Sequence, residues 1–176
     1  NVKKAVIPDS VTNIGGNALS GCSSLESVTL PFIGISEDST YRAFRQLFYY
    51  QYQEYDWESI YAGAVPESLK TVVITNAQSI PSYAFWKCDN IETIRINEGV
   101  EDVGKYAFNG CSSLKNIRLP ESVEVIGDSA FSGCISLTRL PFERVTRIES
   151  SAFGGCTGFT EINLAWGLES IYGNAF

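Results

Sequence analysis

Cysteine is the residue type whose spacing most suggests chemistry. Five cysteines stand at one equivalent place in a repeating pattern, never closer than 22 residues in sequence: Cys22, Cys88, Cys111, Cys134 and Cys156. Cysteines can form disulfides or bind metals, but their count is odd and the chain has no histidine to complete a metal site. We therefore expect a buried, inward-facing column of thiols. Because neighbouring turns bring equivalent Cα atoms within disulfide range, an occasional bridge stays open as an alternative.

Residues that could catalyse a reaction are scarce. Catalysis needs a base, a nucleophile or a metal held in a cleft. The chain has no histidine, no G-x-S-x-G motif, no phosphate-binding glycine loop and no metal-ligand spacing. Asp56 and Glu58 are only a weak candidate for the carboxylate pair of a glycosidase. We predict a protein that is not an enzyme and that uses no metal or other cofactor.

Composition and charge limit the possible partners. The chain has 176 residues, of which 44% are hydrophobic, and this suffices for one domain with a sizeable core. Its net charge of −7 argues against a nucleic-acid partner, which would need a basic face. No apolar run reaches the roughly 20 residues that cross a bilayer, so we expect no membrane insertion.

Internal repetition explains the cysteine spacing. Residues 114–134 read LKNIRLPESVEVIGDSAFSGC, and residues 2–22 read VKKAVIPDSVTNIGGNALSGC. Five phenylalanines recur at intervals of 23, 23, 22 and 23 residues: Phe85, Phe108, Phe131, Phe153 and Phe176. Such a period identifies a repeat architecture, in which each unit buries its apolar face against the next.

Each repeat predicts two extended pieces and a turn. Apolar and polar residues alternate over 117–119, as in a half-buried strand. Pro120 ends that strand because it cannot donate to the ladder. A second extended piece is expected over 123–126, followed by Gly127 at a positive φ. The Ala-Phe pair that comes next should return the chain to the core.

The repeat frame L-x-x-I-x-L-P-x-S-V-x-x-I-G-x-x-A-F-x-G-C-x-x-L resembles the BspA-like class of leucine-rich repeats of bacterial surface proteins, over nearly the whole chain. The resemblance implies a right-handed solenoid with a concave parallel sheet built from the L-x-x-I-x-L strands. It also implies export, an extracellular or cell-surface location, and adhesion to host proteins, other cells or glycans.

The fold class that follows is an α/β-type repeat solenoid, mostly β, with about six turns of 22–23 residues. We expect one leucine-rich-repeat domain over residues 1–176. Because both ends fall inside a repeat, we also expect the native protein to continue into further repeats or domains.

The period is interrupted by an insertion at about residues 33–66. Its stretch from 41 to 61 carries nine aromatics: Tyr41, Phe44, Phe48, Tyr49, Tyr50, Tyr52, Tyr55, Trp57 and Tyr61. Ser39–Thr40 could cap a short helix with Tyr41, Phe44, Leu47 and Phe48 on its apolar face. The insertion either packs these aromatics on the solenoid flank or presents Tyr52, Tyr55 and Trp57 to a sugar or a protein.

Arginines recur on the outward face of the predicted sheet. Alternation places Arg95, Arg118 and Arg139 on three successive strands, roughly 5 Å apart. They are either solvated and paired with Glu92, Glu161 or their neighbours, or they form a stripe that recognises anions. The stripe would bind a carboxylate-bearing or sulfated glycan, or an acidic protein surface.

Two functions follow from these features. The first is an extracellular binding and adhesion module that recognises a host or cell-surface protein or glycan without catalysis. The second is a structural spacer that projects other domains from the cell surface. A spacer has no need of outward arginines or of an aromatic insertion, so these two features favour the binding module.

Overall fold

Short parallel strands carry the fold. The computed structural model describes residues 1–34, 43–49, 65–139 and 143–176. One sheet has the order β1 (Lys4–Val6), β2 (Ser27–Leu30), β3 (Thr71–Ile74), β4 (Thr93–Arg95) and β6 (Asn116–Arg118). A second sheet has the order β5 (Asp102–Val103), β7 (Val125–Ile126), β8 (Arg147–Ile148) and β9 (Ser170–Ile171). The one helical element in the described parts is the 3₁₀ helix η1 (Phe44–Leu47).

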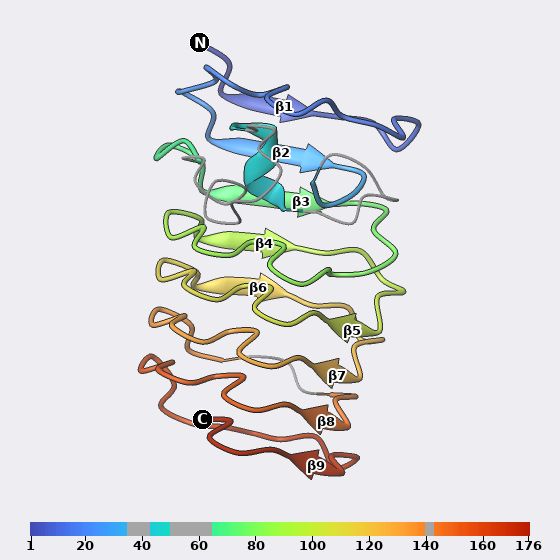
Figure 1. Ribbon diagram of the computed structural model, residues 1–176, viewed down its shortest axis with the longest axis vertical. Coiled ribbons are helices and arrows are strands. Elements are labelled where there is room, and N and C mark those ends of the chain that lie inside the picture. Colours follow the sequence, from blue (N-terminus) through green and yellow to red (C-terminus); the bar gives the residue numbers. More distant parts are fainter. Residues whose placement is uncertain (35–42, 50–64, 140–142) are drawn as a thin grey trace, which may run out of the picture.

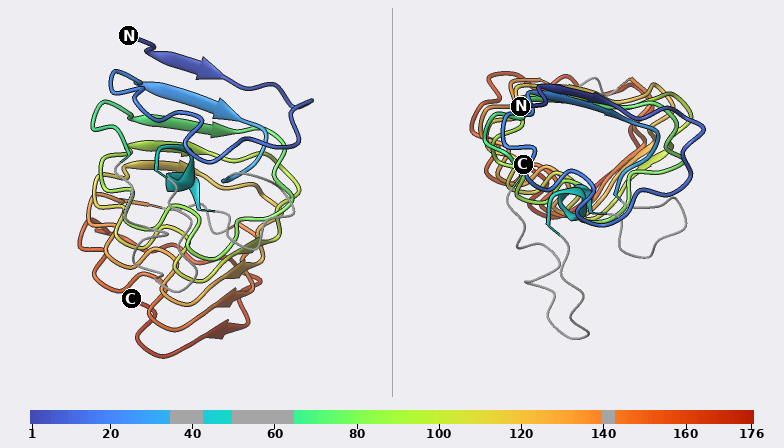
Figure 2. Two further views of the ribbon diagram at one scale, coloured as in Figure 1. Left: turned by 45° about the horizontal axis from the view of Figure 1, so that its top comes forward. Right: turned by 90° about the horizontal axis from the view of Figure 1, so that it is seen from above.

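The chain coils around one axis so that each strand stacks on its equivalent. Figure 1 shows the two sheets running along the long axis, and the end-on view of Figure 2 shows the turns superimposed. In that view the five-stranded sheet and η1 lie on opposite sides of the coil. The molecule is a parallel-sheet solenoid of about six turns, which confirms the predicted fold class.

The five-stranded sheet has one buried and one outward face. In β2, Val28 and Leu30 are buried, while Ser27 and Thr29 are half-buried. The same alternation holds in β3. Parallel pairing aligns Val28 with Val72, and Ile94 with Ile117, so like residues form inward columns. The period-two pattern is therefore obeyed along the chain.

The second extended piece is also found. It was expected over 123–126, and β7 occupies Val125–Ile126. Its inward residue Ile126 aligns with Val103 and Ile148, and all three are buried. Each strand has two residues and pairs with the equivalent piece of the next turn.

Stacked phenylalanines form the centre of the core. Adjacent rings of Phe44, Phe85, Phe108, Phe131, Phe153 and Phe176 have centroid distances of 5.1, 5.4, 4.9, 5.4 and 5.3 Å. Four of these five ring pairs are stacked, and the first is tilted. Aromatic rings bury more apolar area than other side chains and prefer such offset contacts.

The backbone of the Ala-Phe pair forms a second ladder beside the rings. The Phe85 N–H donates to the Ala107 carbonyl at 2.6 Å, and the Phe108 N–H donates to the Ala130 carbonyl at 2.7 Å. The same bond recurs in the following turns. Ring stacking and backbone pairing thus act at the same phenylalanine. The alanine before it is small, which allows the backbones of successive turns to come within hydrogen-bonding distance.

Gly127 is required for a reason other than the predicted one. The expectation of a positive φ there is wrong; positive φ occurs nearby at Ser129 (52°) and Gly133 (77°). At Gly127 an added Cβ would lie 2.6 Å from the Val103 carbonyl oxygen of the preceding turn. The glycine is needed because two turns of backbone meet at this point, where a side chain does not fit.

Removing one ring of the column should destabilise the fold strongly. Phe131 is fully buried between two other rings. We expect Phe131→Ala to lower the free energy of unfolding by about 3–5 kcal/mol, through lost burial and a cavity. Urea denaturation measures the change. The exposed apolar residue Ile135 (51%) provides the control, since Ile135→Ala should stay within about 0.5 kcal/mol.

Close approach between turns can be tested at two equivalent glycines. Gly127 has a preceding turn against it, whereas Gly15, in the first turn, has nothing within 4 Å of an added Cβ. We expect Gly127→Ala to lower the free energy of unfolding by about 1–3 kcal/mol through overpacking. Gly15→Ala should be neutral or slightly stabilising. Equal effects in urea denaturation would contradict the steric explanation.

Candidate binding surface

Arg95 and Arg118 lie side by side on the outward face of the five-stranded sheet. Each is the last residue of its strand, and parallel pairing aligns the two positions. Paired strands lie about 4.8 Å apart, and both side chains are exposed. Two guanidinium groups therefore project into solvent from one edge of the sheet, as the alternation predicted.

Polar side chains occupy most of the other outward positions. One aligned row consists of Lys4, Ser27, Thr71, Thr93 and Asn116, and the next of Val6, Thr29, Val73, Arg95 and Arg118. Hydroxyl and amide groups both donate and accept hydrogen bonds. The surface thus presents hydrogen-bonding groups beside the two arginines.

The carboxylates near the arginines do not neutralise them fully. Arg118 Nη2 lies 3.9 Å from Glu98 Oε1, with 75% and 63% of the two side chains exposed, so this ion pair is weak. Glu92 and Glu161, the expected partners, are engaged elsewhere. Glu92 accepts a hydrogen bond from Lys115 Nζ at 2.9 Å, which lowers the pKa of Glu92. Glu161 accepts from a neighbouring asparagine amide at 2.7 Å.

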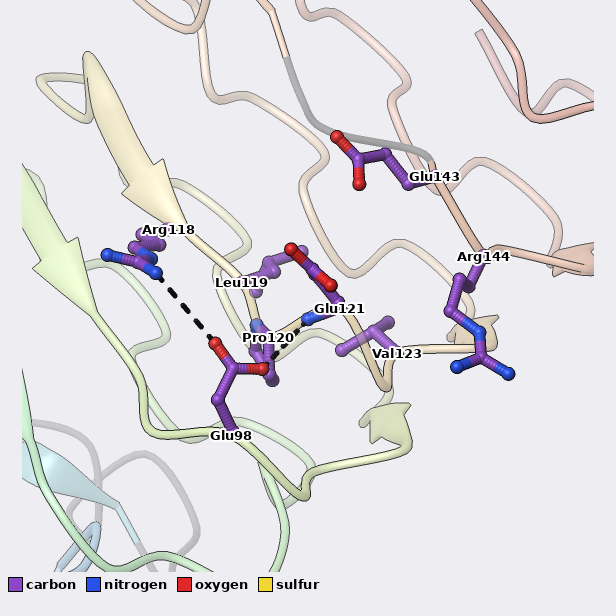
Figure 3. Close-up of a pocket in the computed structure, with 8 residues that line it drawn as sticks. All are labelled: Glu98, Arg118, Leu119, Pro120, Glu121, Val123, Glu143 and Arg144. Carbon is purple, nitrogen blue, oxygen red and sulfur yellow. Dashed lines mark hydrogen bonds and ion pairs between the residues drawn. The ribbon is translucent and has the colours of Figure 1, made fainter.

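A small cavity adjoins the arginine pair, with a volume of about 190 Å³. It is lined by Glu98, Arg118, Leu119, Pro120, Glu121, Val123, Glu143 and Arg144. Figure 3 shows Arg118 and Glu98 on one side, and Glu143 and Arg144 of the next turn on the other. Sequence reasoning missed the cavity because it lies between the ends of successive strands, where no single repeat contains it.

Arg139 is exposed but does not extend the arginine row on a strand. The five-stranded sheet ends at β6, and residues 137–139 form no strand. The predicted placement on a third strand is therefore wrong. The reason lies in the spacing of proline. In the sequence, Pro141 follows Leu137 by four residues, whereas Pro120 follows Leu114 by six. Fewer residues are therefore available between the leucine and the proline to form a strand.

The predicted aromatic site is not tested. Tyr52, Tyr55 and Trp57 lie outside the described residues, as does the expected cap Ser39–Thr40. The described helix η1 is preceded by Ala43, which makes no side-chain capping bond. A role of the three aromatic residues in binding stays a prediction.

The helix η1 belongs to the solenoid core. Phe44 and Leu47 are fully buried, as the predicted apolar face requires. The Phe44 N–H donates to the Ala84 carbonyl at 2.8 Å, and its ring lies 5.1 Å from that of Phe85. Ala43-Phe44 is thus the Ala-Phe pair of its own turn. Sequence reasoning placed it inside the insertion because the longer interruption that follows hides the repeat frame.

The cysteine column is confirmed. Cys88, Cys111, Cys134 and Cys156 are buried, Cys22 is partly exposed, and all five carry free thiols. Cys111 donates its thiol to the Phe85 carbonyl at 3.1 Å, and Cys134 donates to the Phe108 carbonyl at 3.1 Å. Burial raises the pKa of Cys88 to about 12 and that of Cys156 to about 11. These buried thiols bind the turns together and are poor nucleophiles.

The described parts of the chain contain neither a metal-binding cluster nor a membrane-spanning helix. There, no group of three or more histidine, cysteine, aspartate or glutamate residues could hold a metal ion. Within the same residues, no helix is long and apolar enough to cross a bilayer.

The repeat is shared with a known family. Six copies of the BspA type leucine-rich repeat region match residues 1–56 and 66–176. The chain belongs to the BspA-type leucine-rich-repeat family. A comparison with curated proteins finds no match.

Solved structures show the same fold as this BspA-type chain. A leucine-rich cell surface protein from Faecalibacterium prausnitzii has a TM-score of 0.54 at 21% identity, over 91% of this chain and 53% of that one. A leucine-rich repeat protein from Eubacterium ventriosum has a TM-score of 0.59 at 17% identity, over 88% and 43%. The pneumococcal vaccine antigen PcpA has a TM-score of 0.53 at 22% identity, over 95% and 40%. This chain spans about half or less of each of these structures.

Thiol reactivity tests the cysteine column of this BspA-type chain. Thiolates react with iodoacetamide, and a free cysteine has a pKa of about 8.5. At about pH 8 the native protein should be alkylated at Cys22 alone, since burial and raised pKa values protect the other four. Denaturant should expose all five, as mass spectrometry of the adducts would show. Rapid native labelling of Cys111 would contradict the buried column.

Proposed function

We propose that this BspA-type chain is a non-catalytic, extracellular binding and adhesion module. It recognises a host or cell-surface protein or glycan through the outward face of its five-stranded sheet. One observation carries the proposal: Arg95 and Arg118 stand in register on adjacent strands and are exposed, and within the described residues their one ion pair is the weak contact of Arg118 with Glu98. A ligand with carboxylate or sulfate groups complements this pair.

The chemistry of the guanidinium group supports an anionic ligand. Each group offers a planar fork of donors that matches a carboxylate or sulfate with two hydrogen bonds. Two like charges on neighbouring strands repel each other by only about 1 kcal/mol in water. This repulsion is small enough for the two arginines to stand side by side without a ligand. A bound anion would remove it, which favours the bound state.

The adjoining cavity adds selectivity to this surface. It combines three carboxylates with two guanidinium groups, so it suits a ligand that carries charges of both signs more than a simple polyanion. Hydroxyl-bearing residues of β2, β3 and β4 would contact the uncharged part of the ligand. A structural spacer would have no use for this arrangement.

An extracellular location is part of the proposal. The similar protein of Faecalibacterium prausnitzii is described as a cell surface protein, and the BspA type of repeat implies the same setting. Arg139, and the aromatics Tyr52, Tyr55 and Trp57, are proposed as outlying contacts of the same ligand or of a second one.

A binding screen against glycans and extracellular-matrix proteins tests the proposal. We expect wild-type protein to bind at least one of them, and Arg95→Ala with Arg118→Ala to weaken that binding by about tenfold or more, or about 1.4 kcal/mol. Thermal stability should not change, because both side chains are exposed. Surface plasmon resonance and a thermal melt measure the two quantities.

The matched control is Arg147→Ala. Arg147 is an exposed arginine on β8 of the other sheet, where it pairs with Glu149 at 2.9 Å. Its replacement should leave binding unchanged. A parallel variant, Tyr55→Ala with Trp57→Ala, assigns the site to the insertion if it alone abolishes binding. No binding by the wild-type protein would favour the spacer function.

A further inference from the structure

One turn departs from the repeat frame on the side of the coil away from the five-stranded sheet. Around the Ala-Phe pair, the later turns carry serine and glycine: Ser129, Ser132 and Gly133, then Ser151, Gly154 and Gly155. The turn that follows the insertion carries Tyr83, Trp86 and Lys87 at these three places. Tyr106 continues the aromatic substitution into the next turn, next to Lys105.

These five residues form a continuous chain of contacts, the lysine–aromatic patch. Lys87 Nζ lies 4.5 Å from the centroid of the Trp86 ring, which meets the Tyr83 ring edge-on at 6.5 Å. The Tyr83 and Tyr106 rings are stacked at 5.1 Å, and Lys105 Nζ lies 5.1 Å from the Tyr106 centroid. The three aromatic side chains are half-buried and both lysines are exposed. Each end of the patch therefore bears an ammonium group held against a ring.

Lys87 occupies a backbone position that other turns reserve for glycine. Its φ is 52°, where Gly110 has 76° and Gly133 has 77°. A side chain in this left-handed region is sterically unfavourable. Two hydrogen bonds fix the backbone here: Arg45 Nη1 donates to the Lys87 carbonyl at 3.2 Å, and the Lys87 N–H donates to the Asn109 carbonyl at 2.7 Å. A residue kept in an unfavourable conformation, when glycine would fit, points to a use for its side chain.

The charge of the patch is opposite to that of the chain as a whole. The protein has a net charge of −7, yet the patch has two exposed ammonium groups. Lys105 meets Asp128 only at 4.0 Å, with both side chains largely exposed. Among the described residues, no carboxylate forms an ion pair with Lys87. The patch is thus a local cationic surface with an aromatic floor.

We propose that the lysine–aromatic patch binds an acidic saccharide. The ammonium groups of Lys87 and Lys105 would contact its carboxylate or sulfate groups, while the half-exposed rings pack against the apolar C–H faces of the sugar. This site is separate from the arginine pair, since Figure 2 places η1, which contacts this turn, on the other side of the coil from the five-stranded sheet.

The size of the patch decides between classes of ligand. A stable protein interface buries about 800 Å² on each partner, far more than two exposed lysines and three half-buried rings offer. A nucleic acid requires a longer row of cations to neutralise its phosphates, and here only two are present on an acidic protein. A short saccharide needs only a few ring contacts and one or two anionic groups.

Two anionic probes and one neutral probe test the assignment: oligogalacturonate, chondroitin sulfate oligosaccharide and a malto-oligosaccharide. We expect wild-type protein to bind at least one of the anionic probes, and the malto-oligosaccharide about tenfold more weakly or not at all. The preferred anionic probe distinguishes carboxylate from sulfate recognition. Isothermal titration calorimetry at low salt measures the affinities.

Variants that restore the repeat frame separate binding from folding. Lys87→Gly introduces the residue found at this place in other turns, so the fold should be kept while the affinity falls by about tenfold. Tyr83→Ser with Tyr106→Ser should weaken binding similarly, with the circular dichroism spectrum unchanged. Arg147→Ala removes an exposed cation from β8 of the other sheet and should leave the affinity unaltered.

Three results would overturn the assignment. The first is that neither anionic probe binds the wild-type protein. The second is full retention of binding in Lys87→Gly. The third is an equal loss of binding in Arg147→Ala, because the loss would then follow from removing any exposed cation.

Discussion

Each turn of the solenoid meets the next at the Ala-Phe pair, where ring stacking and a backbone hydrogen bond act together. The rings lie about one sheet spacing apart, with centroid distances of 4.9–5.4 Å along the column. The backbone bonds of the pair measure 2.6–2.8 Å. Neither contact can form if one turn shifts by a residue relative to the next. The Ala-Phe pair therefore determines the register in which the strands of neighbouring turns are paired.

The outward surfaces inherit their geometry from that register. Arg95 and Arg118 lie side by side on the adjacent strands β4 and β6. They are aligned because their turns have the same length and the inward residues Ile94 and Ile117 are paired. Among the described residues the five-stranded sheet ends at β6, and the exposed Arg139 lies in no strand. Three thiols of the cysteine column depend on the same alignment, since Cys111, Cys134 and Cys156 each donate to a phenylalanine carbonyl one turn away.

Residues that depart from the repeat frame indicate where a side chain serves a purpose other than folding. The frame tolerates small polar or glycine residues around the Ala-Phe pair, and most turns have them. The turn below η1 instead has aromatic rings and a lysine in a left-handed conformation. Two distinct surfaces result, one cationic through arginine on the five-stranded sheet and one through lysine on the opposite side. A regular scaffold can present both without changing its core.

The sequence alone determined the period, the parallel strands, the phenylalanine and cysteine columns and the shared face of Arg95 and Arg118. It did so because these features repeat, and a repeat places equivalent residues in one column whatever the details of packing. Tertiary structure was needed for features that one repeat does not contain. The cavity beside Arg118 forms between turns, Gly127 is required by the backbone of the preceding turn, and Phe44 is identified as a core residue only by the ring against which it packs. In each case the deciding contact joins residues from different turns, and the distance between them depends on how the turns stack.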